Sequence, residues 1–449
     1  MGRRRKAWWR PERVPRAHPL RSARARTAFV GAVLLVGTSA ALPGHPALAA
    51  GIPTSYAFAP DASPVTGATS RTDAPPLAPG ATYKSSLPSS GEIYYSLDLD
   101  ATSDTYVSVT AVPPPGDVPA SDGIQVSVED AEGHSCSSDT NRFGLVGSAR
   151  PIAVWAAREV SGRRPRCKSA GTYHVIVKRV ATTDSAPGTW NLELFTTSEP
   201  RLKQAGSTSA PEDWNSATPT PLTGESVRRA GGSGFASAAT VGQGLWSSDV
   251  KPGQSLFYKV PLDWGRQLYA TAELGDSSSG DGNVSSAMEV ALYNPARGLV
   301  DHASTGYQGS RRDVELDPLP PVAYENRYAI RGGTSSVRFA GSYYLVVHLA
   351  AEVAERYGEG PLGLTLSVQV GGSAQAGPDY AGKPEPEGVF EVSADDRAAV
   401  AGGVGGAVGR DGDDAAMTVL AVSGIGAGTV VLVVLGVWAV VARRRVGAW

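Results

Sequence analysis

The segment AGTYHVIV (170–177) recurs as AGSYYLVV (340–347), and this pair decides the fold class. In both copies every second side chain after the glycine is apolar or aromatic, which is typical of a strand with a buried face. These positions are Tyr173, Val175 and Val177 in the first copy and Tyr343, Leu345 and Val347 in the second. Each copy is followed by a loop and a second apolar-rich run, PGTWNLEL (187–194) and PLGLTLSV (361–368). We interpret the pair as the same strand in two copies of one β domain.

Three further pairs of segments recur in the same order, at an offset of about 160 to 170 residues. These pairs are GEIYYSL (91–97) with GQSLFYKV (253–260), 106–112 with 268–274, and 125–133 with 289–298. Chance similarity between strand sequences is the alternative, and the shared order of five segments argues against it.

Gly and Pro are abundant, at 53 and 33 residues, and short alternating runs are bounded by turn formers. This composition indicates an all-β ectodomain. We predict two β-sandwich domains, at 76–198 and 225–371, and an insertion in the second copy over roughly 300–339. Residues 50–75 are expected to be flexible, 199–224 to form a linker, and 372–416 to form a disordered Gly/Ala/Asp-rich stalk.

The Gly-bounded, Tyr-containing strand near the start of each copy and the A-G-[ST]-Y-x-[VL]-x-V strand near its end resemble bacterial pre-peptidase C-terminal domains. The resemblance covers about 250 residues of this sequence. It implies two tandem jelly-roll-like β-sandwiches with an adhesive, targeting or folding-support role, and it implies no catalytic residues. The sequence departs from the family pattern because no protease domain accompanies the copies and because the second copy carries the insertion. The layout also resembles actinobacterial-type envelope proteins that have a signal peptide and one membrane helix.

The first 26 residues carry nine Arg and Lys6 against Glu12 alone, and an apolar run of 15 residues, 28–42, follows. That run is too short to span a bilayer core of about 30 Å comfortably. Ala47-Leu48-Ala49 then provides small residues at the positions that signal peptidase reads. We predict a signal peptide over 1–49 that uses the general secretory route, with an uncleaved anchor as the alternative.

Residues 418–442 form a run of 25 residues without a charge, followed at once by Arg443, Arg444 and Arg445. A helix of this length spans roughly 38 Å, and basic residues stay on the cytoplasmic side. We predict a transmembrane helix over 417–442 and a cytoplasmic basic tail over 443–449. The protein is then a single-pass protein of the cytoplasmic membrane with its N-terminal ectodomain outside.

The predicted membrane helix contains Gly424 and Gly428, four residues apart. Small residues at this spacing let two helices approach closely, and a homodimer through the membrane helix is one hypothesis. Gly is common in membrane helices, so the spacing alone does not decide between a dimer and a monomer.

The external part of the chain carries a net charge of about −14, because the excess of basic residues lies in the signal peptide and the tail. This acidic balance argues against nucleic acid as a partner. Cys136 and Cys167 both lie in the external part, where disulfides persist. We predict a structural disulfide between them that closes a loop of about 32 residues.

No motif for a nucleotide, zinc or paired-thiol site is present, and Ser248-x-x-Lys251 precedes Pro252, which favours a turn over a catalytic helix. His174 and His348 alternate with inward residues of their strands, so both are expected to face outward. Asp276, Asp281 and Asn283 lie in one Ser/Gly-rich run. Their oxygens suit Ca²⁺, and a solvated polar loop is the favoured alternative. No other cofactor is expected.

Five external tryptophans could stack on sugars or fill a partner's pocket, and core packing is the favoured alternative. These tryptophans are Trp155, Trp190, Trp214, Trp246 and Trp264, of which Trp190 is expected in the core. We predict a non-catalytic, membrane-anchored extracellular interaction or adhesion protein that binds another envelope protein or a cell-wall polymer. The alternatives are a structural or assembly subunit of a membrane complex and a hydrolase with an unrecognised site.

Overall fold

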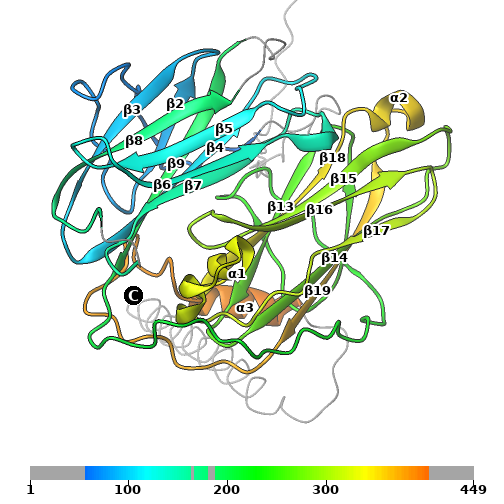
Figure 1. Cartoon of the computed structure of the whole chain (residues 1–449). Helices are drawn as coiled ribbons and strands as arrows, with labels where there is room; N and C mark the ends of the chain where they lie inside the picture. The colour runs from blue at the N-terminus through cyan, green and yellow to red at the C-terminus, as the bar shows by residue number, and fades with distance from the viewer. Residues whose placement is uncertain (1–55, 163–165, 181–187, 404–449) are drawn as a thin grey trace, which may run out of the picture. The chain divides into compact units, whose positions relative to one another are not determined.

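The computed structural model of the protein describes residues 56–162, 166–180 and 188–403, which belong to one compact unit (Figure 1). The predicted signal peptide, transmembrane helix with Gly424 and Gly428, and cytoplasmic tail lie outside these residues. Within the described ranges, no helix combines the length and the apolar character that a membrane crossing requires.

The first half of the described chain forms two sheets packed as a sandwich. One sheet has the order β1-β2-β9-β4-β7 and the other β3-β8-β5-β6. The elements are β1 (Ser63–Pro64), β2 (Thr82–Leu87), β3 (Glu92–Leu99), β4 (Ser103–Val112), β5 (Gly123–Glu129), β6 (Ser135–Arg142), the 3₁₀ helix η1 (Gly144–Val146), β7 (Ile152–Arg158), β8 (Gly171–Val180) and β9 (Trp190–Pro200).

The second half forms two further sheets, with the orders β10-β12-β19-β14-β17 and β11-β13-β18-β15-β16. Its strands are β10 (Val227–Arg228), β11 (Ala239–Thr240), β12 (Gly244–Val250), β13 (Ser255–Leu262), β14 (Gln267–Leu274), β15 (Val284–Tyr293), β16 (Leu299–Tyr307), β17 (Arg312–Glu315), β18 (Gly341–Leu349) and β19 (Leu362–Gly371). Its helices are η2 (Tyr324–Tyr328), α1 (Gly332–Ser336), α2 (Val353–Tyr357) and α3 (Ala394–Gly403).

The two sandwiches repeat the same topology. The five pairs of matched segments become β3 and β13, β4 and β14, β5 and β15, β8 and β18, and β9 and β19, which occupy equivalent places in the sheet orders. Even an isolated antiparallel bridge recurs, between Ala68 and Tyr94 and between Gly232 and Phe257. The predicted all-β sandwich architecture and the internal repeat are therefore confirmed.

The predicted insertion over 300–339 is wrong. The segment contains most of β16 and all of β17, which are the counterparts of β6 and β7 in the first sandwich, and the short helices η2 and α1 follow them. The sequences of these edge strands differ too much between the two copies for the match to be visible in the sequence.

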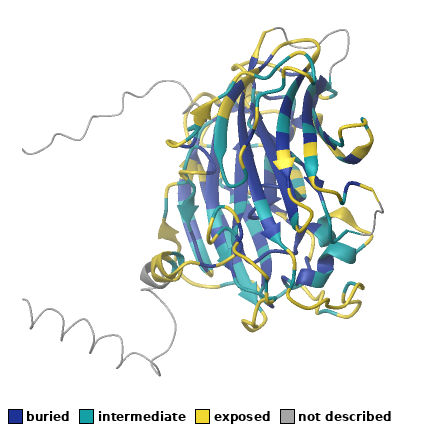
Figure 2. Cartoon of the chain, turned by 90° about the vertical axis from the view of Figure 1, so that its left-hand side faces the viewer, coloured by how far each residue is buried: buried dark blue, intermediate teal, exposed yellow. Residues whose placement is uncertain are grey.

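Each sandwich has its own apolar core. Figure 2 shows buried residues along the strands and exposed residues in the connecting turns. Trp190 is fully buried in the first core, as predicted, and Trp246 is buried in the second. Trp155, Trp214 and Trp264 are half-buried.

The outer faces of two sheets are also buried, because the sandwiches pack on each other. Phe257 and Val346 point away from their own core, yet they pack in a second apolar cluster with Ala153 of the first sandwich. In a third cluster the Tyr106 ring lies 5.2 Å from the Phe339 ring. Strands buried on both faces lose the simple alternation of polar and apolar residues.

Buried ion pairs link the two sandwiches across this interface. Arg297 pairs with Glu193 at 2.5 Å, and Arg338 pairs with Glu159 at 2.6 Å. Arg327 contacts both Asp104, at 3.3 Å, and Glu199, at 2.6 Å. These contacts require both halves of the chain, so the sandwiches form a single packed body.

Three predicted flexible segments are ordered where the structure describes them. β9 extends through Pro200, so the predicted linker begins inside a strand and its first residue, Glu199, is buried. In the predicted N-terminal flexible segment, the buried Tyr56 donates a hydrogen bond to Glu193 at 2.9 Å. In the predicted stalk, Phe390 is buried and stacks on Phe339, with ring centroids 4.3 Å apart. The composition of these segments predicts flexibility, and it does not indicate that a few aromatic side chains, such as Tyr56 and Phe390, pack against the sandwiches.

Candidate functional site

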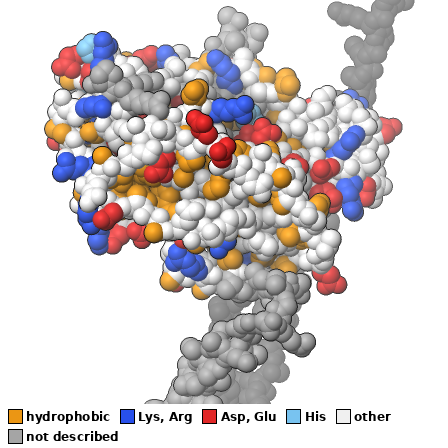
Figure 3. All heavy atoms as spheres, turned by 60° about the horizontal axis from the view of Figure 1, so that its bottom comes forward, with side chains coloured by type: hydrophobic (Ala, Val, Ile, Leu, Met, Phe, Trp, Pro, Cys, Tyr) orange, Lys and Arg blue, Asp and Glu red, His pale blue; other side chains and the backbone are white. Residues whose placement is uncertain are grey.

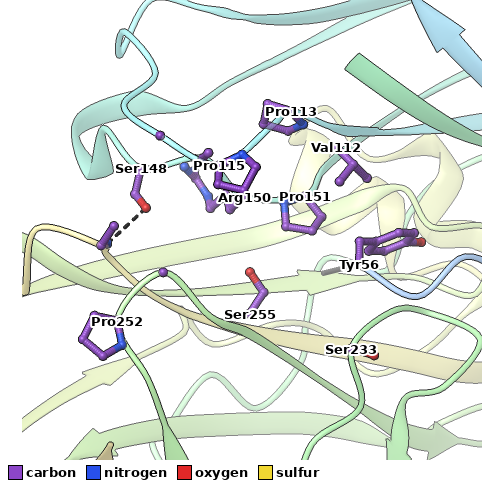
Figure 4. Close-up of a pocket in the computed structure, with 14 residues that line it drawn as sticks. Tyr56, Val112, Pro113, Pro115, Ser148, Arg150, Pro151, Ser233, Pro252 and Ser255 are labelled. Atoms are coloured by element: carbon purple, nitrogen blue, oxygen red, sulfur yellow. Dashed lines mark hydrogen bonds between the residues drawn. The ribbon is translucent and has the colours of Figure 1, made fainter. Parts of the chain in front are cut away.

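A cavity of about 200 Å³ opens where the two sandwiches and the N-terminal segment meet (Figure 4). The first sandwich contributes the end of β4 and the loops before β5 and β7. The second contributes Ser233, the turn before β13 with the start of that strand, and Ala351 just after β18. Its lining residues are Tyr56, Val112, Pro113, Pro115, Gly116, Ser148, Ala149, Arg150, Pro151, Ser233, Pro252, Gly253, Ser255 and Ala351. Pockets at such junctions, apolar with a few polar groups, are the usual form of ligand sites in proteins.

Prolines shape the walls of the cavity. Pro113 follows the last residue of β4, where a residue without an N–H ends the ladder, and Pro115 lies two residues on. Gly116 has φ +135°, a conformation that favours glycine, and its carbonyl accepts a hydrogen bond from the Ala149 N–H at 3.2 Å. This bond holds the two loops of the first sandwich together. Pro252 opens the turn before β13 on the opposite wall.

A buried chain of hydrogen bonds lies at the second sandwich's wall of the cavity. Ser255 and His348 are register partners on β13 and β18, and the Ser255 hydroxyl lies 3.0 Å from His348 Nδ1. His348 Nε2 lies 3.2 Å from the hydroxyl of Ser148, which comes from the first sandwich. The Ser148 hydroxyl also accepts the Ala351 N–H at 3.1 Å, the bond that Figure 4 draws.

The outward placement predicted for His348 is wrong. Only 2 % of His348 is exposed, because the face of the sheet that would meet solvent in an isolated sandwich is covered by the loop at Ser148. Burial, together with the nearby Arg150 charge, lowers the pKa of His348 from its ordinary 6.5 to about 3. The ring is therefore neutral at physiological pH.

Arg150 of the first sandwich makes a bidentate contact with Glu289 on β15. Its Nε and Nη2 lie 3.1 and 2.9 Å from the two carboxylate oxygens of Glu289. Glu289 and His348 are register partners, so Ser255, His348 and Glu289 lie side by side on three strands. Arg150 is buried, and among the described residues its remaining nitrogen, Nη1, has no hydrogen-bond partner.

This geometry favours binding over nucleophilic catalysis. Both ring nitrogens of His348 face serine hydroxyls, whereas a catalytic histidine is usually oriented by a carboxylate. A base with a pKa near 3 is also poorly matched to taking a proton from serine at neutral pH. The serine hydroxyls can instead orient a ligand in an apolar cavity.

The first sandwich shows what these positions look like on an open sheet. The register pair equivalent to Ser255 and His348 is Glu92 and Lys178, which form an exposed ion pair at 3.7 Å. At these two positions the second copy has a small residue and a neutral residue, whereas the first copy has a charged pair. This difference was the sequence signal that indicated a covered face in the second copy. Sequence reasoning missed Ser148, Arg150 and Ser255 because they become neighbours only through the packing of the sandwiches.

The residues predicted as calcium ligands do not meet at this cavity. The Asp276 carboxylate accepts the Arg311 N–H at 2.8 Å, and the Asn283 side chain contacts Gln308 at 3.3 Å. Calcium binding at Asp276, Asp281 and Asn283 therefore stays a prediction. A different group, Asp130, Glu132 and His134, brings three potential ligand atoms within 4.8 Å of one another at the surface.

The predicted disulfide is confirmed. Cys136 on β6 and Cys167 before β8 are bonded, with a Cα–Cα distance of 5.7 Å.

The face shown in Figure 3 intersperses acidic and basic side chains and carries hydrophobic side chains between them. This mixed pattern differs from the basic stripe of nucleic-acid-binding proteins.

No protein family and no curated protein matches this sequence. Among solved structures, the CUB1-EGF-CUB2 domain of human MASP-1/3 is 8% identical, with 64% of this chain and 99% of that chain covered and a TM-score of 0.17. The CBM22-1-CBM22-2 tandem domain of Paenibacillus barcinonensis Xyn10C is 8% identical, with 67% and 93% covered and a TM-score of 0.19. The tandem CBM51 modules of a Streptococcus pneumoniae family 98 glycoside hydrolase are 8% identical, with 65% of this chain and 83% of that chain covered and a TM-score of 0.18. At these TM-scores the likeness carries no argument about function.

The burial of neutral His348 makes stability depend on pH. In the unfolded chain this histidine titrates near 6.5, whereas in the native state its pKa is about 3, so unfolding takes up a proton below pH 6.5. Its contribution to stability is fully present above pH 6.5 and falls by about 1.4 kcal/mol per pH unit below it. Between pH 7 and pH 5 we expect the free energy of unfolding of the native protein to fall by about 2 kcal/mol more than that of the His348→Gln variant. Denaturant unfolding at both pH values measures the difference, and equal losses in the two proteins would count against a buried neutral histidine.

Proposed function

We propose that this protein is a non-catalytic, membrane-anchored extracellular binding protein whose ligand site is the cavity at the junction of the two sandwiches. The observation that carries the proposal is the convergence of the N-terminal segment and loops of both sandwiches on one apolar cavity with buried polar groups. The ligand is another envelope protein or a cell-wall polymer. The small apolar cavity favours a protein, because it is suited to a protruding side chain.

The disulfide supports an extracellular setting, because such bonds persist in oxidising compartments. The signal peptide and the C-terminal membrane helix remain part of the proposal, as does the adhesive role implied by the resemblance to pre-peptidase C-terminal domains. In this arrangement the packed interface fixes the loops of both sandwiches relative to each other, which lowers the entropic cost of binding.

Site-specific photocrosslinking in the cells that make the protein tests the proposal. A photoreactive amino acid replaces Pro115, an exposed residue at the cavity, in the full chain. We expect it to crosslink a discrete partner, and we expect a second change, Ala351→Phe, to reduce the yield at least tenfold. Ala351 is exposed at the cavity, so the added ring blocks the opening without entering the core.

The matched control is Ala205→Phe, which adds the same ring at an exposed position in the segment between the sandwiches. It should leave the crosslink unchanged. Equal yields in Ala351→Phe and Ala205→Phe would mean that the partner binds elsewhere, and the cavity would lose its assigned role. A partner whose abundance falls when the gene is deleted, with no cavity-dependent crosslink, would favour an assembly subunit instead.

A further inference from the structure

The chain after β19 packs on both sandwiches. Residues 372–403, which we call the strap, leave the second sandwich, cross to the first and return to end in α3 (Figure 1, orange). On the first sandwich, Glu385 forms an antiparallel bridge with Ser198 of β9, and Tyr380 forms one with Leu202 just after β9. The strap is therefore a second connection between the sandwiches, in addition to the segment that follows β9.

Few side chains anchor the strap. Of its residues up to 400, only Pro384, Phe390 and Val392 are buried. The Phe390 ring stacks on Phe339 of the second sandwich, with ring centroids 4.3 Å apart. Three ion pairs add weaker contacts, because each includes a side chain that is at least 29% exposed. These pairs are Lys203–Asp379, Lys259–Asp396 and Arg397–Asp263.

The strand that precedes the strap is held in a different way. β19 lies between β12 and β14 and makes register pairs with both strands over most of its length. A pull along β19 loads all of these pairs at the same time, whereas a pull on the strap loads its two isolated bridges one after the other. Regions with few buried contacts open before the core of a protein does. Detachment from the C-terminal side should therefore stop at β19.

The composition of the strap suits a detached state. Residues 372–392 are mainly Gly, Ala, Pro and charged residues, with few large apolar side chains among them. A segment of this kind remains a flexible coil when nothing holds it. The 32 residues of the strap reach about 105–115 Å when they are fully extended. Detachment therefore converts a packed segment into a long tether.

The docked strap also completes the interface between the sandwiches. Tyr380 donates a hydrogen bond to the buried Glu199 at 2.7 Å, and Phe390 belongs to the apolar cluster that contains Tyr106 and Phe339. Detachment removes these contacts, so the docked form is favoured when no force acts. The strap should therefore dock again when a pull ends.

We infer that the strap is a releasable tether: a pull on the chain beyond Gly403 peels it from the sandwiches before either sandwich unfolds, and the release is reversible. This inference goes beyond the proposed function, because it requires no ligand in the cavity. In the proposed membrane-anchored protein, the strap gives the ectodomain two reaches, a short one when docked and one that is longer by up to about 110 Å when released.

A single-molecule force measurement tests the order of release. The purified full chain in detergent is held at a clickable amino acid that replaces Glu359, an exposed residue shortly before β19, and at a tag after Trp449. The pull then runs along β19, which resists it. We expect a first, reversible lengthening that includes the extended length of the strap, about 105–115 Å, at a force that leaves both sandwiches folded.

A disulfide that holds the strap near its middle assigns this lengthening. Ser198 and Glu385 exchange both backbone hydrogen bonds, at 2.7 and 2.9 Å. The Cα atoms of such a pair lie about 5.5 Å apart, which suits a disulfide. The double variant Ser198→Cys, Glu385→Cys retains residues 372–385, so the first lengthening should be shorter by about 45–50 Å. Glu385→Cys alone is the matched control and should keep the full lengthening.

Hydrogen exchange without a pull provides a second measurement. Phe390→Ala and Phe143→Ala form a matched pair, because the two rings are 1% and 0% exposed. The N–H groups of Ala381 and Glu385 donate to the first sandwich, and Phe390→Ala should speed their exchange at least tenfold. Phe143 lies in the first core, so Phe143→Ala should speed exchange in the strands around it and leave these two strap amides unchanged.

Three outcomes would overturn the inference. One is a first force step that unfolds a whole sandwich. Another is an equal first step in the disulfide variant and in Glu385→Cys, because the lengthening would then arise outside the strap. The third is equal acceleration of the Ala381 and Glu385 amides by both phenylalanine variants, because the strap would then open only when the protein unfolds. None of these results bears on the cavity, whose role is decided by the crosslinking experiment.

Discussion

Replacing Arg327 by Met should lower the free energy of unfolding by about 3–5 kcal/mol, the largest effect that we expect from a single substitution. The Arg327 side chain is buried between Asp104, at 3.3 Å, and Glu199, at 2.6 Å. Its Nε also donates to the Tyr324 carbonyl at 3.0 Å. Methionine fills much of the space, but it leaves two carboxylates of the first sandwich buried without their cation.

The neighbouring groups make this loss hard to relieve. Burial and the Glu199 charge already raise the pKa of Asp104, which shows how little solvent screens this pair. The hydroxyls of Tyr106 and Tyr380 donate to Glu199 at 2.8 and 2.7 Å, but hydroxyls do not replace a positive charge. Denaturant unfolding of the purified chain measures the effect.

Arg228→Met is the matched control, because Arg228 pairs with Asp249 at the surface, with 72% and 48% of the side chains exposed. Exposed pairs contribute at most about 1 kcal/mol, so this variant should remain near native stability. In a second control, Asp104→Asn and Glu199→Gln are added to Arg327→Met, which removes the unpaired charges and should restore part of the loss. A cost of under 1 kcal/mol for Arg327→Met alone would contradict the interface described above.

Opening the Cys136–Cys167 disulfide should destabilise the protein by about 3–4 kcal/mol. The two cysteines are 31 residues apart in the sequence, so the bond removes much of the entropy of a long loop in the unfolded chain. It also holds the segment before β8 against β6, and both sulfurs lie in the first core. The double variant Cys136→Ser, Cys167→Ser avoids leaving a free thiol.

Reductant separates the bond from the side effects of substitution. Dithiothreitol should lower the unfolding midpoint of the native chain to about that of the double variant, and it should not change the double variant. An unfolding midpoint of the native chain that is insensitive to full reduction would argue against a stabilising role for this bond.

The sequence was sufficient to predict the features that depend on one sandwich at a time. The five repeated segments predicted equivalent strands because a strand with one buried face leaves an alternating pattern. Trp190 followed from that alternation, and the disulfide followed from two cysteines in a segment predicted to be external.

Features that depend on both sandwiches could not be predicted in the same way. Alternation alone places His348 in solvent, because nothing in a single strand reports that Ser148 of the other sandwich covers it. A partial signal was present in the run Leu256-Phe257-Tyr258, where consecutive apolar residues indicate a strand buried on both faces. The low-complexity composition of 372–392 likewise concealed Phe390, whose stacking on Phe339 requires the assembled interface.

The central claim is that the cavity at the junction of the sandwiches is the site at which this protein binds its partner. Its most direct test is the equilibrium affinity of the purified full chain for the partner recovered by crosslinking, measured for the native protein, Ala351→Phe and Ala205→Phe. We predict that Ala351→Phe raises the dissociation constant at least tenfold, while Ala205→Phe leaves it within twofold of the native value. Equal affinities for all three proteins would contradict the claim.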